Sequence, residues 1–372
     1  MQKKEYPFYI KSTAVLLGLI LAVYIFINLR DILVPIAFAM IIAMLLNQAV
    51  NRFKKWGVPN TVAISLALLL SIILVASIFY FLSSQIAGFG DNVPLLKSKF
   101  SMLLHQFQEW LHNRFGIGIQ KQVQLLNEAL NSSKTLIGTT LGTALGTLTI
   151  VLLLPVYTFL MLFYKKLILN FLFEVFADED SPRVRDILNQ TKSAIQSYMV
   201  GLLIEALIVA ILNSTALLIL GVKYAVLLGV IGALLNMIPY LGGIVAIALP
   251  VLIATVTKDG FSTQLGIIIA YMFIQFVDNN FLVPRIVSSK VQINALISII
   301  IVLLGGAMWG VSGMFLSIPL VAILKIIFDR VEDMKPWGKL LGDEVPTRHR
   351  GQLLLRRRKK KESLSEKIVE GN

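Results

Sequence analysis

Residues 224–256 read YAVLLGVIGALLNMIPYLGGIVAIALPVLIATV, an apolar run that is interrupted at its centre by NMIPYLGG (236–243). As a helix, each half would be about 21 to 24 Å long, whereas the hydrocarbon core of a membrane is about 30 Å thick. Neither half comfortably spans a membrane. The pattern therefore predicts a helical hairpin that is broken by glycine and proline at membrane depth.

A second segment of the same design covers residues 293–327, where GGAMWGVSG (305–313) separates two apolar runs. Paired, glycine- and proline-interrupted hydrophobic segments are a sequence indication of a transporter's binding site. Between the two lie one full span, at 263–281, and a polar joint from Asp278 to Lys290. Each broken hairpin either re-enters the side it came from or crosses the membrane fully, and the sequence allows both topologies.

Non-helical backbone survives at membrane depth only where it is buried in protein or lines a wet cavity. The two interruptions are therefore expected to face a shared polar cavity, with the carboxylates Glu205 and Asp278 reachable from it. Alternatively, the glycines only permit tight turns, the asparagines only cap helices, and Glu205 reaches back to the membrane surface. The predicted substrate or ion pathway consists of Glu205, Asn236, Pro239, Tyr240, Gly242, Gly243, Asp278, Asn279, Arg285, Gly305 and Gly306.

The composition indicates an all-α integral membrane protein. Of the 372 residues 56% are hydrophobic and 15% are charged, and the mean hydropathy is +0.79. A soluble protein has roughly a quarter charged residues. Five further apolar runs, together with the full span and the two broken hairpins, predict about eight membrane segments. Basic residues precede the first run and follow the second, which places both termini of this multi-pass protein in the cytoplasm.

Six parts are expected along the chain. They are N-terminal transmembrane helices (1–82), an extracytoplasmic amphipathic helical segment (83–137), a fourth transmembrane helix (138–166), a cytoplasmic interfacial connection (167–200), a transport core (201–330) and a cytoplasmic basic tail (331–372). In the second part, the apolar stripes pack on each other or form a seam between subunits. In the third, Gly138, Gly142 and Gly146 form a small-x-x-x-small face for close helix packing, within one subunit or between subunits.

The formal charge of +13 is concentrated near the ends of the apolar runs and in the tail. Anionic lipid headgroups are therefore the expected partner. Nucleic acid is not expected, because the basic run from Arg356 to Lys361 has no aromatic residues between its charges. With no cysteine and three histidines that are not at ligand spacing, neither a metal site nor a cofactor is expected.

In order and spacing, PYLGG (239–243), NNFLVPRI (279–286), the glycines at 305–306 and IPL (318–320) resemble the autoinducer-2 exporter family of bacterial membrane proteins. The resemblance runs from the first span to Arg330. It implies a homo-oligomer in the bacterial cytoplasmic membrane, and its members are assigned export of a furanone-type quorum signal or sodium or lithium/proton antiport. The chain departs from the family pattern at Leu202, at Ser288-Ser289 and at Asn294-Ala295.

The expected function is transport of a small solute without ATP hydrolysis, as an exporter of a small polar signalling molecule or metabolite, because no Gly-x-x-x-x-Gly-Lys-Ser/Thr loop is present. One alternative is sodium or lithium/proton antiport with Glu205 or Asp278 as the coupling carboxylate. An alternative of another class is a non-catalytic membrane scaffold, which would not need two broken helices. An enzyme is not expected, because His-Glu-x-x-His and Gly-x-Ser-x-Gly are absent and no catalytic residues stand out.

Overall fold

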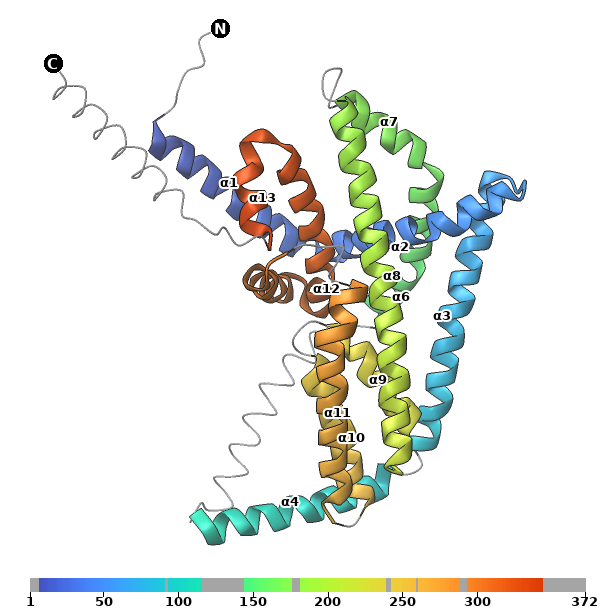
Figure 1. Cartoon of the computed structure of the whole chain (residues 1–372), viewed down its shortest axis with the longest axis vertical. Coiled ribbons are helices and arrows are strands. Elements are labelled where there is room, and N and C mark those ends of the chain that lie inside the picture. The colour runs from blue at the N-terminus through green and yellow to red at the C-terminus, as the bar shows by residue number, and fades with distance from the viewer. Residues whose placement is uncertain are drawn as a thin grey trace, which may run out of the picture.

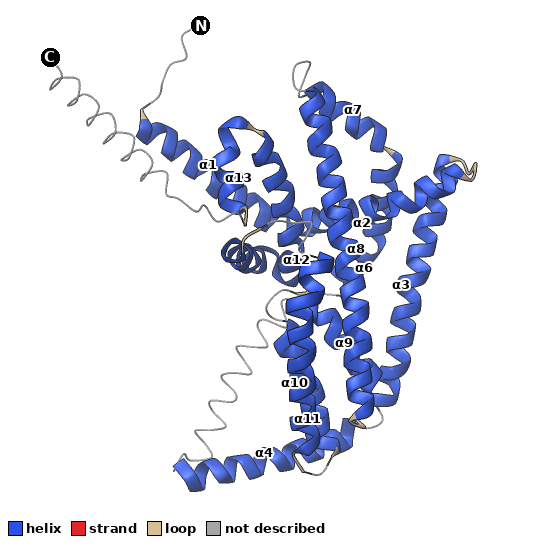
Figure 2. Cartoon of the chain, viewed as in Figure 1, coloured by secondary structure: helices blue, strands red, loops and turns tan. Residues whose placement is uncertain are grey.

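The computed structural model describes residues 7–90, 93–115, 144–175, 181–238, 242–258, 260–287 and 293–343, and within these ranges all regular structure is helical (Figures 1 and 2). The predicted all-α class is confirmed for these residues. The α-helices are α1 (Phe8–Asn28), α2 (Arg30–Lys55), α3 (Asn60–Gly90), α4 (Val93–Phe115), α6 (Ala144–Phe163), α7 (Lys165–Val175), α8 (Ser181–Ile219), α9 (Ala225–Asn236), α10 (Gly242–Thr257), α11 (Ser262–Val277), α12 (Ala295–Arg330) and α13 (Lys335–Leu341). A π-helix, η1 (Asp278–Val287), follows α11, and a short 3-10 helix, η3 (Glu332–Met334), precedes α13.

Several helices are long and apolar enough to cross a membrane, as expected for a multi-pass protein. Five pass this test within the described residues, and α6 with α7 makes a sixth if the pair, bent by 63°, is one span. Helices α1, α9 and α10 are apolar but shorter. Helix α4 lies across one end of the molecule, at a steep angle to α8 (Figure 1). Its predicted extracytoplasmic position stays a prediction.

The 39-residue helix α8 joins two halves of the structure. Near its start it packs with α2, η1 and α12 around Ile195 and Leu316, and near its end it packs with α9, α10 and α11 around Leu217 and Ile267. All four of these residues are fully buried. The face of α8 that serves both cores repeats with helical spacing at Tyr198, Leu202, Glu205, Val209, Asn213 and Leu217.

Helices α9 and α10 form an antiparallel hairpin at the first interruption. The backbone at Gly242 lies so close to the carbonyl of Leu235 that a Cβ there would overlap it, and a Cβ on Gly232 would lie 3.4 Å from the Cβ of Ala246. Both helices are 16 residues long or shorter. The predicted break between two short helices is therefore present.

Helix α12 folds back on itself at the second interruption. Gly310, at the bend, has φ 62° and ψ −143°, a conformation that is far from helical and that glycine adopts without steric cost. Beside the bend, the Gly305 and Gly313 backbones are in direct contact. At the open end, Asn294 Nδ2 donates to the carbonyl oxygens of Leu340 (2.8 Å) and Gly342 (3.0 Å). The chain thus returns to the region from which it entered the hairpin.

The polar joint expected from Asp278 to Lys290 begins as helix. The helix continues from α11 as η1, a π-helix that includes Pro284. A π-helix pairs residues five apart, and Pro284, which has no N–H to donate, lies within this wider turn. Side chains help to hold this turn, since Asn280 Nδ2 donates to the carbonyl oxygen of Phe276 at 2.8 Å. Ser288, Ser289 and Lys290 lie outside the described residues.

Two glycine substitutions test the bend in α12. Neither Gly310 nor Gly18 has any atom within 4 Å of the place where a Cβ would be added, so the two sites differ only in backbone conformation. We expect Gly310→Ala to cost about 1 to 3 kcal/mol of stability, and Gly18→Ala, within α1, to leave stability unchanged or raise it by up to about 1 kcal/mol. Thermal unfolding in detergent measures both. Equal melting temperatures for the two variants would contradict the bend.

Candidate functional site

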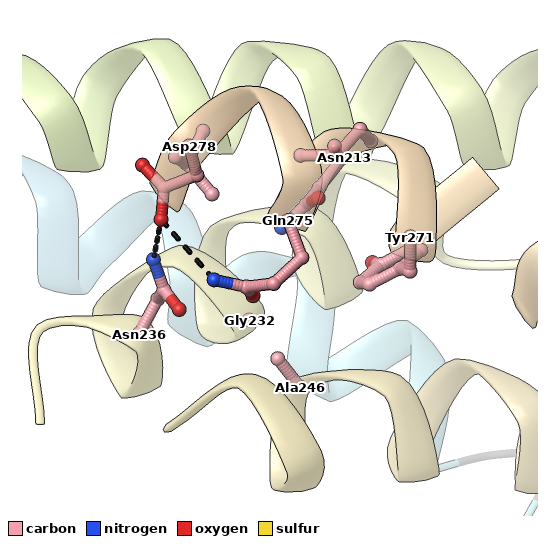
Figure 3. A pocket seen from close by; sticks show the side chains of 9 residues that line it. Asn213, Gly232, Asn236, Ala246, Tyr271, Gln275 and Asp278 are labelled. Carbon is pink, nitrogen blue, oxygen red and sulfur yellow. Dashed lines mark hydrogen bonds between the residues drawn. The ribbon is translucent and has the colours of Figure 1, made fainter. Parts of the chain in front are cut away.

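Residues of four α-helices and of the π-helix η1 line one small cavity in the half of the molecule built from α9, α10 and α11 (Figure 3). Its volume is about 10 Å³ for a water-sized particle, which is room for about one water molecule. Side chains from α8, α9, α11 and η1 make up its polar lining, and α10 contributes a small apolar one. The lining residues are Val209, Asn213, Gly232, Asn236, Ala246, Tyr271, Ile274, Gln275 and Asp278.

Asp278 is the centre of a hydrogen-bond network at one side of this cavity. Its Oδ2 accepts a hydrogen bond from Asn236 Nδ2 at 2.9 Å and another from Gln275 Nε2 at 3.3 Å (Figure 3). Gln275 Nε2 also donates to Asn279 Oδ1 at 3.2 Å. Because Asn236 is the last residue of α9 and Asp278 the first of η1, this network ties the broken hairpin to the long helix beside it.

Glu205 of α8 also belongs to this network, through its contact with Asp278. Its carboxyl group lies within hydrogen-bond reach of that of Asp278. The residues are only 5% and 2% exposed, and within the described part of the chain neither forms an ion pair with a basic side chain. A hydrogen bond between two carboxyl groups needs a proton on one of them, since two buried carboxylates repel each other.

Apart from the contact between the Glu205 and Asp278 carboxyl groups, three buried polar atoms at the cavity have no hydrogen-bond partner in the described part of the chain. They are Asn213 Oδ1, the Tyr271 hydroxyl and Asp278 Oδ1. Leaving such an atom unpaired costs about 1 to 3 kcal/mol, so buried polar groups normally have a hydrogen-bond partner. Since all three belong to residues that line one cavity, the site is suited to a guest that supplies hydrogen-bond donors and acceptors.

The structure brings together part of the predicted pathway. Asn236, Asp278 and Glu205 meet in the network, and Gly243 lies beside it, where an added Cβ would be 2.8 Å from Gln275 Oε1. Gly242 packs on Leu235 at the hairpin tip.

The other predicted residues lie elsewhere. Asn279 is exposed and reaches the network only through Gln275, and Arg285 is exposed, with its guanidinium 5.9 Å from the centre of the Phe281 ring. Gly305 and Gly306 pack inside the α12 hairpin and do not line the cavity. Gly146 belongs to α6, and four predicted residues lie outside the described residues: Gly138, Gly142, Pro239 and Tyr240.

Sequence reasoning missed Asn213, Tyr271 and Gln275. Each is a polar residue inside an apolar helix, and helical spacing from a predicted residue would have found it. Asn213 lies eight residues after Glu205, on the same face of α8. Gln275 and Tyr271 lie three and seven residues before Asp278, on the same face of α11.

Two substitutions of Asp278 separate its role as an acceptor from its charge. Asp278→Asn keeps an oxygen that can accept from Asn236 Nδ2, whereas Asp278→Leu leaves this amide without an acceptor. We expect the leucine variant to lose about 1 to 3 kcal/mol of stability relative to the asparagine variant, measured by thermal unfolding in detergent. If both variants are destabilised equally, the charge rather than the hydrogen bond holds the network together.

Known proteins with similar sequences are transport proteins. The family model described as AI-2E family transporter matches residues 14–333. AI-2 transport protein TqsA of Escherichia coli is 25% identical over 319 residues, which cover 84% of this chain and 90% of that protein. Putative transport protein YueF of Bacillus subtilis is 26% identical, with 79% and 82% covered, and putative permease PerM of Escherichia coli is 27% identical, with 85% and 92% covered. A match over most of the chain, with a helical structure that contains several candidate membrane spans, shows that this protein belongs to the AI-2E transporter family.

Proposed function

We propose that this protein exports a small polar solute across the cytoplasmic membrane without ATP hydrolysis, and that the solute binds at the network of Asn236, Gln275 and Asp278. The transporter role follows from the family. The observation that carries the binding site is the group of unpartnered polar atoms around one cavity between α8, α9, α10 and α11. Buried polar groups without partners are expensive in a membrane protein, which supports a functional use.

The chemistry of the network favours a neutral, hydroxyl-rich solute. Amide groups of Asn213, Asn236 and Gln275 offer both donors and acceptors, and the Tyr271 hydroxyl offers one donor. None of the described residues that line the cavity is basic, so an anionic solute would have no countercharge among them. The relative from Escherichia coli named as an AI-2 transport protein makes AI-2 the first solute to test.

Transport requires the site to open, because the cavity holds about one water molecule and not a metabolite. The α9–α10 hairpin is the element best suited to move. It is short, and it contacts α8 through glycines: a Cβ on Gly229 would overlap Ser214 Oγ, and one on Gly232 would lie 3.3 Å from Asn213 Nδ2. Smooth glycine faces allow two helices to slide or separate without side chains that interlock.

The packing of the α12 hairpin supports a transporter whose two broken hairpins meet. Met237, next to Asn236, and Trp309, next to the bend in α12, both pack against the core cluster that contains Leu316. The two interruptions therefore lie on one core, as expected where two re-entrant hairpins meet near the middle of a membrane. Trp309 Nε1 also donates to the carbonyl oxygen of Phe26 at 2.8 Å, which fixes the bend of α12 to α1.

The proposed exporter has cytoplasmic termini and forms a homo-oligomer. Basic residues at the end of α2 and at the start of α7 support cytoplasmic termini, and the many exposed apolar side chains of α1 suit contact with lipid or with other subunits of a homo-oligomer. Sodium or lithium/proton antiport has no support in the names of the relatives. A scaffold would not explain the unpartnered atoms at the cavity.

Uptake of AI-2 by everted vesicles tests the proposal. Vesicles with the wild-type protein should accumulate AI-2 above vesicles without it, and Asp278→Asn should lower the initial rate roughly tenfold or more, because it replaces the charged acceptor available to the solute by a neutral amide. The matched control is Asp31→Asn, because the Asp31 side chain is 88% exposed and lies outside the network.

Two outcomes would contradict it. If Asp278→Asn and Asp31→Asn transport AI-2 at the wild-type rate, the network is not the binding site. If correctly inserted wild-type protein does not transport AI-2 but moves protons when sodium or lithium is added, the protein is an antiporter rather than a solute exporter.

A further inference from the structure

A second buried polar cluster lies where α2, α7 and the first half of α8 meet, away from the cavity. Lys165, the first residue of α7, donates from Nζ to Asn47 Oδ1 at 3.1 Å. Asn47 belongs to α2 and is only 5% exposed. Because a lysine ammonium can only donate, this contact fixes the amide so that Nδ2 points away from Lys165. That Nδ2 is buried and has no hydrogen-bond partner.

This cluster has an excess of positive charge. Lys54 of α2 and Lys192 of α8 lie close enough to Lys165 to repel its ammonium group. Thr191, next to Lys192, is buried, and its hydroxyl has no partner in the described part of the chain. Three lysine side chains thus lie near one another, and the one printed acceptor for Lys165 among the described residues is Asn47 Oδ1.

No described carboxylate supplies the missing negative charge. Asp186 of α8 is paired with Arg330, with 2.7 Å between its Oδ2 and the Arg330 Nε. Glu174 is exposed near the far end of α7, and Asp31 lies at the opposite end of α2. Gathering cations costs free energy unless an anion is bound with them. The cluster is therefore complete only with an anionic guest.

The position of the cluster indicates what kind of anion it meets. Lys165 follows directly on the apolar helix α6, at the bend of 63° between α6 and α7. Exposed aromatic side chains surround this level of the protein, with Tyr164 at 48% and Trp56 at 70% exposure. Tyrosine and tryptophan concentrate at the depth of lipid headgroups. Phosphate groups occur at this depth and accept several charge-assisted hydrogen bonds from lysine and amide donors.

We propose that Lys165, Lys192 and Lys54 bind a phosphate group at the bend between α6 and α7, supplied by an anionic lipid headgroup, with Lys165 held in place by Asn47 Oδ1. A lipid held there bridges three helices, α2, α7 and α8. Since α8 also carries Glu205 and Asn213, an occupied phosphate site fixes the helix on which the cavity depends. Free inorganic phosphate has the same chemistry and is separated from lipid by the experiment.

Thermal unfolding of the full chain, delipidated in neutral detergent, tests the site. Phosphatidylglycerol should raise the melting temperature more than phosphatidylcholine does, because a ligand that binds only the folded protein stabilises it. Lys165→Gln should lose most of this difference. The matched control is Lys166→Gln, which removes the same charge from the neighbouring, exposed position and should keep it.

Inorganic phosphate, compared with chloride at equal ionic strength, identifies the source. If phosphate alone raises the melting temperature of the wild type but not of Lys165→Gln, the site binds free phosphate. If neither phosphatidylglycerol nor phosphate stabilises the wild type specifically, or if Lys165→Gln and Lys166→Gln respond alike, the proposal is wrong. Lys54→Gln, at an exposed position, repeats the comparison should Lys165→Gln fail to fold.

Discussion

The hydrogen bond from Asn236 Nδ2 to Asp278 Oδ2 joins the end of a broken hairpin to the start of a π-helix. Both elements interrupt regular helix in an apolar part of the molecule, where no water is available to satisfy polar groups. Each therefore depends on the other for a partner. With Glu205 in reach of Asp278, this contact lies where α9 ends, where α11 continues as η1 and where the inner face of α8 meets both.

The same constraint explains why the cavity is polar in so apolar a protein. Once α8, α9 and α11 present a carboxyl pair and several amides to one point, the cost of burial can be offset only by hydrogen bonds or by a guest. Protein partners satisfy Asp278 Oδ2, while Asp278 Oδ1, Asn213 Oδ1 and the Tyr271 hydroxyl remain. A structure that needed only stability would have replaced these groups with apolar side chains, since that is commonly neutral or favourable.

Much of the fold could be predicted from the interruptions in the sequence. The sequence NMIPYLGG predicted the α9–α10 hairpin, and the glycines at 305–313 predicted the bend in α12. Glycine and proline end helices through their own backbone conformation, whatever packs around them. Helix η1 could not be predicted in this way. Asn279, Asn280 and Pro284 are typical of a loop, yet they lie within the wider hydrogen-bond spacing of a π-helix. Likewise, Gly305 was predicted to face the cavity but packs on Gly313, a contact that depends on how two half-helices meet.

The absence of cysteine from the chain makes opening of the site directly measurable. Ala246 lines the cavity and Ala63 lies in the core of α2, α3 and α6, and their exposures are 4% and 0%. In native membrane vesicles, Ala246→Cys should react with a small membrane-impermeant thiol reagent while Ala63→Cys does not, because only a transport site opens to water. If both thiols stay unreactive from either side of the membrane, the cavity is a closed part of the core and not a solute site.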